Sequence, residues 1–472
     1  MDTKFNPLIA VPGRATRVVR LRRNSRGQIA IIMALCLVVL VAMAGLAVDS
    51  GRAYGVKAKL NAAVDAASIA GARALSQGAT DAERMANAQE AATRYFQANF
   101  PNSYLGAAAG TIQTTTVHDA AGYWRVTARG MATMPVTLLQ LLPSALQSFS
   151  VVATGQAIRR DVDVMLVLDT SGSLGPPTSP SDTLSKIKAA AINGFVSRFA
   201  AAPGGDRVGL VSFASGAVLD VAINKTSGRG FVRSNSSHTG VEDRINALTI
   251  TGSTAQAEGL RRGLAELEAV PVNVRSGLRV ILLFSDGAPN DVSAGFTRTP
   301  SSGPAIAVSG DLYSETDSPA TARATRVYRS DQRDQQLGDY NDIVTLPAVG
   351  LGGVPLGGRR ALTAGTPYAN TRCNVNKAAR NMVENVADAA RSEKILVYTI
   401  GLGARLNSNE ITFCGYNSAE YGSAILRRLA NDVSADTYDA EEPTGRYCYA
   451  ADADQLATCF SDIASEVLRL TQ

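Results

Sequence analysis

The residues best suited to chemistry form the pentapeptide Asp169-Thr-Ser171-Gly-Ser173, which directly follows a run of apolar residues. That run, 164–168, predicts a fully buried strand of the kind found at the centre of a parallel sheet. The pentapeptide would then lie at the strand's carboxyl end, where open α/β sheets bind ligands. One carboxylate and two hydroxyls are hard oxygen ligands, which suit Mg²⁺, Ca²⁺ or Mn²⁺. Because no Cys or His lies nearby, a zinc site is not expected.

Two later loops carry further oxygen ligands at equivalent places in the predicted sheet. Thr254 lies just before a predicted helix, and Asp286 follows an aliphatic strand at 279–284. Two carboxylates only just neutralise a divalent cation, and hydroxyls are weak neutral ligands. A coordination position is therefore left for water or for a partner's carboxylate, which favours adhesion or assembly over catalysis. The five expected metal ligands are Asp169, Ser171, Ser173, Thr254 and Asp286.

The elements that must position these residues alternate between strand and helix from Asp161 onward, which predicts a doubly wound parallel sheet. The predicted strands are 162–168, 207–213, the edge strand 218–223, 279–284 and 395–401, and the predicted helices are 182–199, 255–267, 375–390 and 453–468. An insert at about 291–372, rich in Ser, Thr, Gly and Pro, interrupts the alternation. A loop of that length inside a compact domain is usually functional or disordered.

A basic tail and an apolar run begin the chain. Residues 1–28 contain seven Lys or Arg against one Asp, and residues 29–48 are apolar throughout. The run is long enough to cross a bilayer as a helix. The positive-inside rule then places the N-terminus in the cytoplasm and the bulk of the chain on the other side of the membrane, with this helix as a single-pass anchor. A cleaved signal peptide is the alternative, because Ala42-Met43-Ala44 resembles a cleavage site.

A helical stalk and a small α+β unit are predicted after the span. Small residues recur from Ala53 to Ala74 at spacings of three and four. Such a face packs either on its own domain or beside partner helices. A second helix ending near residue 100, a hairpin of 111–117 with 123–128, a short helix around 138–142 and a strand at 149–153 follow. The expected organisation is a basic tail (1–28), a transmembrane helix (29–48), the stalk and small unit (49–157), and an α/β domain (158–472).

Several functional classes are disfavoured. Beyond residue 28 the chain has 39 basic and 40 acidic residues, so nucleic-acid binding has no support. Asp161-Val-Asp163 resembles the opening of a phosphotransfer motif, but residues 157–160 are too polar for the buried strand that such enzymes need. No Walker loop and no Ser/His/Asp set occurs, so we expect no enzyme. Four cysteines fall beyond the span, and their three possible disulfide pairings remain open: Cys373, Cys414, Cys448 and Cys459.

Two parts of the chain resemble known families. The pentapeptide, the phrase Asp206-Arg-Val-Gly-Leu-Val-Ser-Phe213, Thr254 and Asp286 together resemble the metal-ion-dependent adhesion site of von Willebrand factor A domains. This resemblance implies that the serines and the threonine ligate the metal directly, and that the aspartates often act through water. Residues 26–75, including Gly45-Leu-Ala-Val-Asp-Ser-Gly-Arg-Ala-Tyr54, resemble TadG-like proteins of the Flp (tight-adherence) pilus assembly system.

The two resemblances together imply a function. They imply a membrane-anchored, metal-dependent protein-binding component of Flp/Tad pilus assembly or anchoring, with Mg²⁺ as the first choice of cation. They also imply that the membrane is the inner membrane of a bacterium and that the bulk of the chain is periplasmic. Its partners would be other pilus-assembly or envelope proteins, one of which could complete the metal shell with an acidic residue. Two alternatives stay open. The chain could be a surface adhesin for a host or matrix ligand, or a structural scaffold whose metal is not used for binding.

Overall fold

The chain forms two compact units. A computed structural model describes residues 25–75, 81–119, 123–137, 147–175, 182–201, 205–225, 229–315, 319–408, 411 and 414–471. The smaller unit comprises residues up to 59, 102–110 and 131–152, and the larger comprises 60–101, 111–130 and 153–472. The domain boundaries given above stay a prediction.

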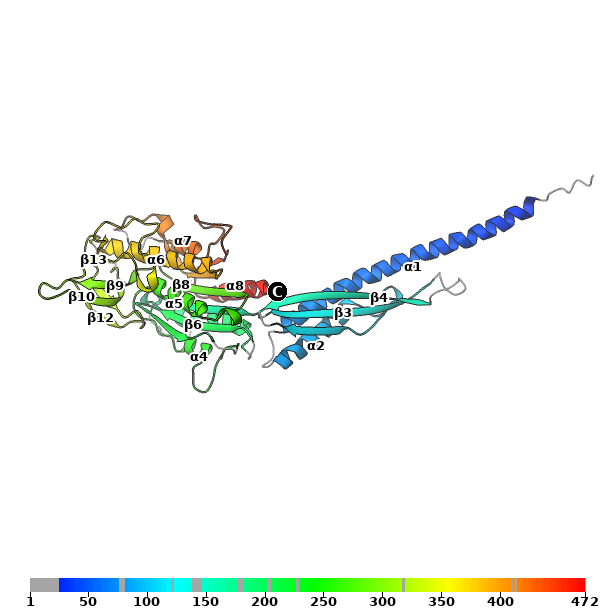
Figure 1. Cartoon of the computed structure of the whole chain (residues 1–472), viewed down its shortest axis with the longest axis horizontal. Coiled ribbons are helices and arrows are strands. Elements are labelled where there is room, and N and C mark those ends of the chain that lie inside the picture. The colour runs from blue at the N-terminus through cyan, green and yellow to red at the C-terminus, as the bar shows by residue number, and fades with distance from the viewer. Residues whose placement is uncertain are drawn as a thin grey trace, which may run out of the picture. The chain divides into compact units, whose positions relative to one another are not determined.

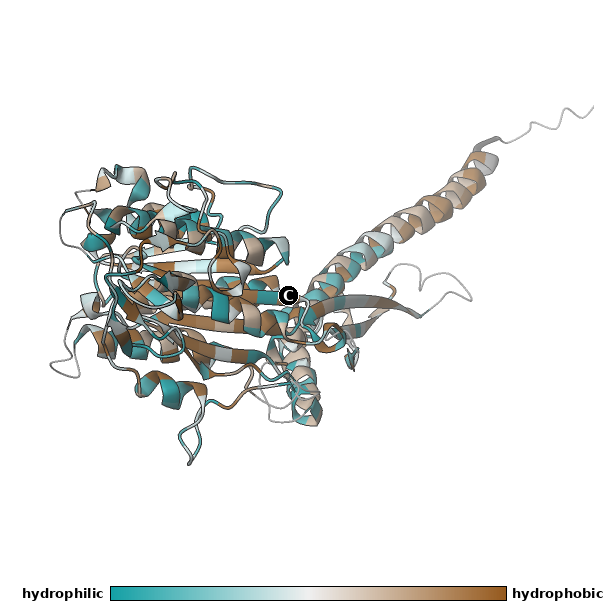
Figure 2. Cartoon of the chain, turned by 60° about the vertical axis from the view of Figure 1, so that its left-hand side comes forward, coloured by the Kyte–Doolittle hydropathy of each residue, from teal (hydrophilic) through white to brown (hydrophobic). Residues whose placement is uncertain are grey.

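Helix α1 (Ser25–Ala74) begins with the apolar run and continues through the predicted stalk. Its segment Ile29–Ala74 contains an 18-residue window of mean hydropathy 3.0 that is 6% buried, so by length and composition this helix can cross a membrane. Figure 2 shows the hydrophobic colour concentrated along the N-terminal part of α1. The small-residue face of its last turns is buried within the larger unit, and Gly71 lies against Ala88 of α2 (Asp81–Asn99). The small-residue face was expected to pack either on its own domain or beside partner helices, and the structure shows it packed on its own domain.

An antiparallel sheet follows α2. Its strands are β1 (Ala108–Ala109), β2 (Gln113–His118), β3 (Tyr123–Pro135) and β4 (Ser148–Arg160), in the order β1-β3-β2 with β4 paired to β3. The pairing of His118 with Trp124 confirms the predicted hairpin. The short helix predicted around 138–142 lies outside the described residues.

The centre of the larger unit is a six-stranded sheet in the order β16-β15-β8-β5-β6-β7. Its strands are β5 (Val162–Asp169), β6 (Arg207–Phe213), β7 (Ala217–Val221), β8 (Leu278–Ser285), β15 (Leu396–Leu402) and β16 (Tyr447–Ala450). All neighbours are parallel except β7, which pairs antiparallel with β6 at the edge. The doubly wound sheet and its edge strand are therefore confirmed, and β16 is a strand that the sequence patterns did not predict.

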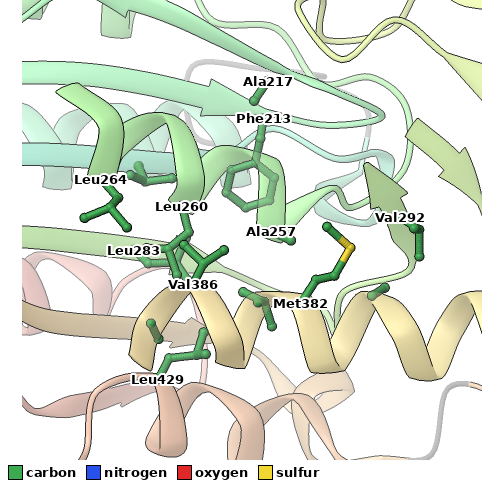
Figure 3. Close-up of a cluster of buried hydrophobic side chains, with 14 of the residues drawn as sticks. Phe213, Ala217, Ala257, Leu260, Leu264, Leu283, Val292, Met382, Val386 and Leu429 are labelled. Atoms are coloured by element: carbon green, nitrogen blue, oxygen red, sulfur yellow. The ribbon is translucent and has the colours of Figure 1, made fainter. Parts of the chain in front are cut away.

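Helices cover both faces of this sheet. Successive residues of β5 alternate between two hydrophobic clusters, so Val167 packs with α5, α6 and α7, and Leu168 packs with α3, α4 and α8. Figure 3 shows the first cluster, where Leu260, Leu283 and Met382 meet from two helices and a strand. The helices are α3 (Thr183–Ala189, continued by the π-helical Ala190–Phe195 and the 3₁₀ turn Val196–Arg198), α4 (Val241–Asn246), α5 (Gln256–Glu268), α6 (Arg372–Ser392), α7 (Gly422–Leu429) and α8 (Leu456–Leu470).

The insert is folded, which corrects the expectation of one long loop (Figure 1). It contains an antiparallel sheet in the order β12-β11-β10-β9 and a short pair, β13 with β14. The strands are β9 (Asp291–Arg298), β10 (Ile306–Tyr313), β11 (Arg326–Tyr328), β12 (Gln336–Asp339), β13 (Thr345–Leu346) and β14 (Tyr368–Ala369). Val292, Phe296 and Leu312 join the same cluster as Leu283. Burial of these apolar residues offsets the poor strand propensity of the intervening Ser and Gly residues.

Two disulfides fix the last quarter of the chain. The long-loop disulfide joins Cys373 to Cys414, 41 residues apart, and the short-loop disulfide joins Cys448 to Cys459, 11 residues apart. Cys36 is a free, exposed cysteine of α1. The pairing that the sequence left open is thereby resolved as two local bridges.

Candidate metal centre

The predicted ligands lie on three loops at the carboxyl edge of the central sheet. Asp169 is the last residue of β5, and the 3₁₀ turn Gly172–Leu174 follows it. Asp286 comes directly after β8, whose Phe284 is paired with Leu168. Because β5 and β8 are parallel neighbours in this register, their final residues reach the same point of the edge.

Hydrogen bonds join four of the five predicted ligands. The Ser171 amide donates to Asp169 Oδ1 at 2.7 Å, and the Ser171 and Ser173 hydroxyl oxygens lie 2.9 Å apart. The Ser173 hydroxyl donates to Asp286 Oδ1 at 2.6 Å. Asp169 and Ser171 are 1% exposed and Asp286 is 6% exposed. The structure thus brings these oxygen atoms together in a nearly buried cluster.

Thr254 lies on the adjoining loop and is 5% exposed. The Gly172 amide donates to the Gly252 carbonyl at 3.0 Å, which holds this loop against the pentapeptide. Gly252 has a φ of 65°, and a Cβ there would lie 2.4 Å from the Ser215 hydroxyl, so the turn requires glycine. The Thr254 amide donates to Asn290 Oδ1 at 2.8 Å. Among the described residues, no hydrogen bond joins the Thr254 hydroxyl to the other four ligands.

Two supporting residues were not predicted as part of the site. The Ser285 hydroxyl donates to Asp169 Oδ2 at 2.5 Å and thereby orients the carboxylate. Gln256 Nε2 donates in turn to the Ser285 hydroxyl at 2.7 Å. Ser285 stands beside Asp286 in the sequence and could have been suspected from that position. The role of Gln256 depends on the tertiary structure, and no pattern in the sequence indicates it.

The electrostatics of the cluster fit a hard cation. Burial raises the pKa of Asp169 to about 6, although hydrogen bonds from Ser171 and Ser285 lower it, and no Arg or Lys is among its main influences. In the described ranges no group of three or more His, Cys, Asp and Glu side chains could hold a metal. A cation site there must therefore combine fewer carboxylates with hydroxyl or carbonyl oxygens. Two carboxylates and three hydroxyls are such a set, and they suit Mg²⁺ or Ca²⁺.

Comparison with protein families matches two segments. Residues 27–74 match the Flp pilus-assembly TadE/G-like family, and residues 164–288 match the von Willebrand factor type A domain. The chain thus contains one segment that matches the TadE/G-like family and another that matches the von Willebrand factor type A domain. The second match contains all five predicted ligands, and the first covers most of α1. Together with its apolar composition, the TadE/G-like segment suggests a membrane anchor.

Solved structures of low sequence identity resemble the chain. The vWF domain of the type V pili tip protein Mfa5 from Porphyromonas gingivalis is 16% identical, with a TM-score of 0.37, over 67% of this chain and 98% of that one. The adhesive tip pilin GBS104 from Group B Streptococcus agalactiae is 13% identical, with a TM-score of 0.33, over 77% and 69%. BatB from Bacteroides thetaiotaomicron is 13% identical, with a TM-score of 0.31, over 65% and 99%. A comparison with curated protein sequences gave no match.

Proposed function

We propose that this protein is a membrane-anchored component of a Flp/Tad pilus apparatus that binds another envelope protein through a divalent cation. The observation that carries the proposal is the hydrogen-bonded cluster of Asp169, Ser171, Ser173 and Asp286 at the edge of a von Willebrand factor type A sheet. The TadE/G-like segment in the same chain points to pilus assembly.

The donor set supports binding more than catalysis. A divalent cation at the five residues would have its charge balanced by Asp169 and Asp286, while the hydroxyls of Ser171, Ser173 and Thr254 add neutral oxygens. Mg²⁺ is our first choice, and Ca²⁺ or Mn²⁺ would suit the same donors. We propose that an acidic residue of the partner completes the shell.

We propose no enzymatic role for the cluster. Of the two histidines, His118 contacts Asp81 and Asp161, and the side chain of His238 is 85% exposed. Neither is hydrogen-bonded to a predicted metal ligand in the part of the chain that the structure describes. Neither histidine is therefore placed to activate Ser171 or Ser173 as a nucleophile.

The proposed location is the inner membrane, with the N-terminus in the cytoplasm, residues 29–48 in the bilayer and the chain after residue 48 outside. The Arg-rich tail before α1 supports this orientation through the positive-inside rule. The two disulfides support an oxidising compartment for the last quarter of the chain. Fractionation that found the intact protein in the outer membrane would contradict this location and favour a surface adhesin.

The test compares the full chain with two variants, in detergent and in the bacterium. Asp169→Asn keeps the shape of the side chain but removes one of two ligand charges. We expect Mg²⁺ affinity to fall by more than about 100-fold, because loss of an outer-shell partner alone typically costs 10–100-fold. The matched control is Asp220→Asn, a partly buried aspartate of β7 whose partner is Ser212. Its Mg²⁺ affinity should equal that of the wild type.

The same variants test whether the cation serves binding. We expect Asp169→Asn, like EDTA, to abolish capture of pilus-assembly proteins by the solubilised chain and to reduce pilus production. Normal capture and normal piliation in a variant that no longer binds Mg²⁺ would refute metal-dependent binding, and would support a scaffold role instead.

A further inference from the structure

A second group of oxygen atoms lies on the insert, away from the five predicted ligands. In the hairpin of β9 and β10, Ser293 is directly opposite Asp311, and Asp291 precedes Ser293 by two residues. Side chains two residues apart on a strand share one face, and directly opposed residues do so too. The carboxylates of Asp291 and Asp311 and the hydroxyl of Ser293 therefore project from the same face of the hairpin.

These side chains are buried and unpartnered. Asp291 and Asp311 are fully buried, and Ser293 is 1% exposed. All four carboxylate oxygens and the Ser293 hydroxyl lack a hydrogen-bond partner within the described chain. Asp163 is equally buried, but it accepts hydrogen bonds from Arg207 and Ser276. Burial of an uncompensated carboxylate is strongly unfavourable, so the pair on the insert requires a compensating group.

Nearby cations do not supply that compensation. Arg261 and Arg262 lie near Asp311, but both form their ion pairs with Glu258. Arg326 lies near Asp291, but it forms its ion pair with Glu315. The Ser253 hydroxyl and the Thr254 amide, both neutral groups, also lie near Asp291.

Further negative charge surrounds the same place. Burial raises the pKa of Asp311 well above its usual range, and the charges of Glu258 and Asp291 raise it further. Asp334 is a further carboxylate close to Asp291. The carboxylates of Asp291 and Asp311 thus lie close enough to raise each other's energy when both are charged, and a bound cation would relieve that repulsion.

Neutral oxygens lie near Asp311 as well. A Cβ added to Gly216 would lie 2.3 Å from the Arg329 carbonyl oxygen, 2.4 Å from that of Gln332 and 3.1 Å from Asp311 Oδ2. The two carbonyls and the carboxylate oxygen are therefore all adjacent to one point on the backbone. Backbone carbonyls together with carboxylates are the usual ligand set of Ca²⁺ in proteins.

We propose that Asp291 and Asp311 hold a second divalent cation, with Ser293 and the nearby backbone carbonyls as additional ligands. Ca²⁺ is preferred over Mg²⁺, because Mg²⁺ usually retains several waters and the carboxylates here are fully buried. The cation would fasten the insert beside the loop that carries Ser253 and Thr254. This inference does not depend on the proposed function, since it uses none of the five ligands of the first site.

The test counts Ca²⁺ ions bound by the detergent-solubilised full chain after equilibrium dialysis. We expect two ions for the wild type, one for Asp169→Asn, and one for the double variant Asp291→Asn/Asp311→Asn. Asp220→Asn should retain both ions. An Asp169→Asn protein that binds no Ca²⁺, or a double variant that still binds two ions, would overturn the proposal.

A second measurement separates loss of the cation from loss of the fold. Asparagine is close in shape to aspartate and removes the buried charges, so in EDTA the double variant should unfold at a temperature equal to or above that of the wild type. In the Asp169→Asn background, Ca²⁺ should still raise the unfolding temperature, and adding the double substitution should abolish that rise. An unchanged rise in this triple variant would refute the site. If Ca²⁺ does not raise the unfolding temperature in the Asp169→Asn background, the second cation site is refuted too. Protonation of Asp291 and Asp311 would then be what neutralises the pair.

Discussion

Asp163, six residues before Asp169 on the same strand, should be essential for stability and irrelevant to metal binding. Its carboxylate accepts hydrogen bonds from Arg207 Nε at 2.8 Å and Nη2 at 2.9 Å, and from the Ser276 amide at 3.0 Å and hydroxyl at 2.6 Å. Asp163 and Arg207 are both fully buried. The substitution Asp163→Asn keeps the volume but leaves the Arg207 guanidinium with backbone carbonyls only, at Asn224 and Val274.

The expected cost follows from that burial. Removing one partner of a buried ion pair destabilises a protein by about 3–5 kcal/mol, because the remaining charge stays desolvated and uncompensated. Replacing both partners should cost less than the sum of the single substitutions, since the double variant Asp163→Asn/Arg207→Met buries no unpaired cation. Groups in direct contact typically show couplings of about 0.5–3 kcal/mol.

Pulse proteolysis of the full chain in detergent, over a range of urea concentrations, measures these free energies of unfolding. Asp163 and Asp169 are about 20 Å apart along β5, at roughly 3.3 Å per residue. The folded fraction of Asp163→Asn should therefore bind Mg²⁺ with wild-type affinity. A cost below about 1 kcal/mol, or additive costs in the double variant, would refute the electrostatic reasoning. Loss of Mg²⁺ affinity as large as in Asp169→Asn would refute the separation of the two roles.

Three further perturbations test other parts of the larger unit. Burial raises the pKa of Glu384, but hydrogen bonds and charges from Arg360 and Arg428 outweigh burial and hold it below its usual value. The stability that Glu384 contributes is therefore present above pH 4.5 and lost as the pH falls below it. The free energies of unfolding of the Glu384→Gln variant and the wild type should converge on acidification. A difference between them that stays constant with pH would contradict this. Cys→Ser substitution of the long-loop disulfide should lower the free energy of unfolding by about 4 kcal/mol, and that of the short-loop disulfide by about 3 kcal/mol, because closing a longer loop costs more entropy. The reverse order in urea unfolding would contradict this explanation. Gly445→Ala should destabilise by at least about 1–3 kcal/mol, because its Cβ would lie 1.9 Å from the Val397 carbonyl oxygen, and an unchanged unfolding midpoint would show that the backbone can shift there.

The elements that could be predicted are those whose local residue pattern matches their burial in the folded chain. The aliphatic runs of β5 and β8 are buried on both faces, and this composition is what identifies them. By contrast, β16 has only four residues and is held in the sheet by pairing with β15. Helix α7 has only eight residues. Such short elements are stabilised by packing more than by propensity, so their residues carry a weak local signal.

The same distinction applies to the candidate site. Asp169, Ser171 and Ser173 are neighbours in sequence and could be found from their spacing and from the strand before them. Gln256 could not, because its hydrogen bond to Ser285 joins residues 29 positions apart. Disulfide partners and the acids on the hairpin of β9 and β10 depend likewise on contacts between segments that only the folded chain brings together.

The folded insert also changes what counts as one domain in this chain. The match to the von Willebrand factor type A domain stops at residue 288, whereas the hydrophobic core continues through Val292, Phe296 and Leu312 to Met382 on α6. The boundary of the recognisable family is therefore not a boundary of cooperative folding. Among relatives that carry this insert, changes of side-chain volume on β9 should be accompanied by opposite changes on α6, because the two elements share one packed interior. A fragment trimmed at the family boundary would expose that interior to water, so the insert and the sheet form a single packed unit.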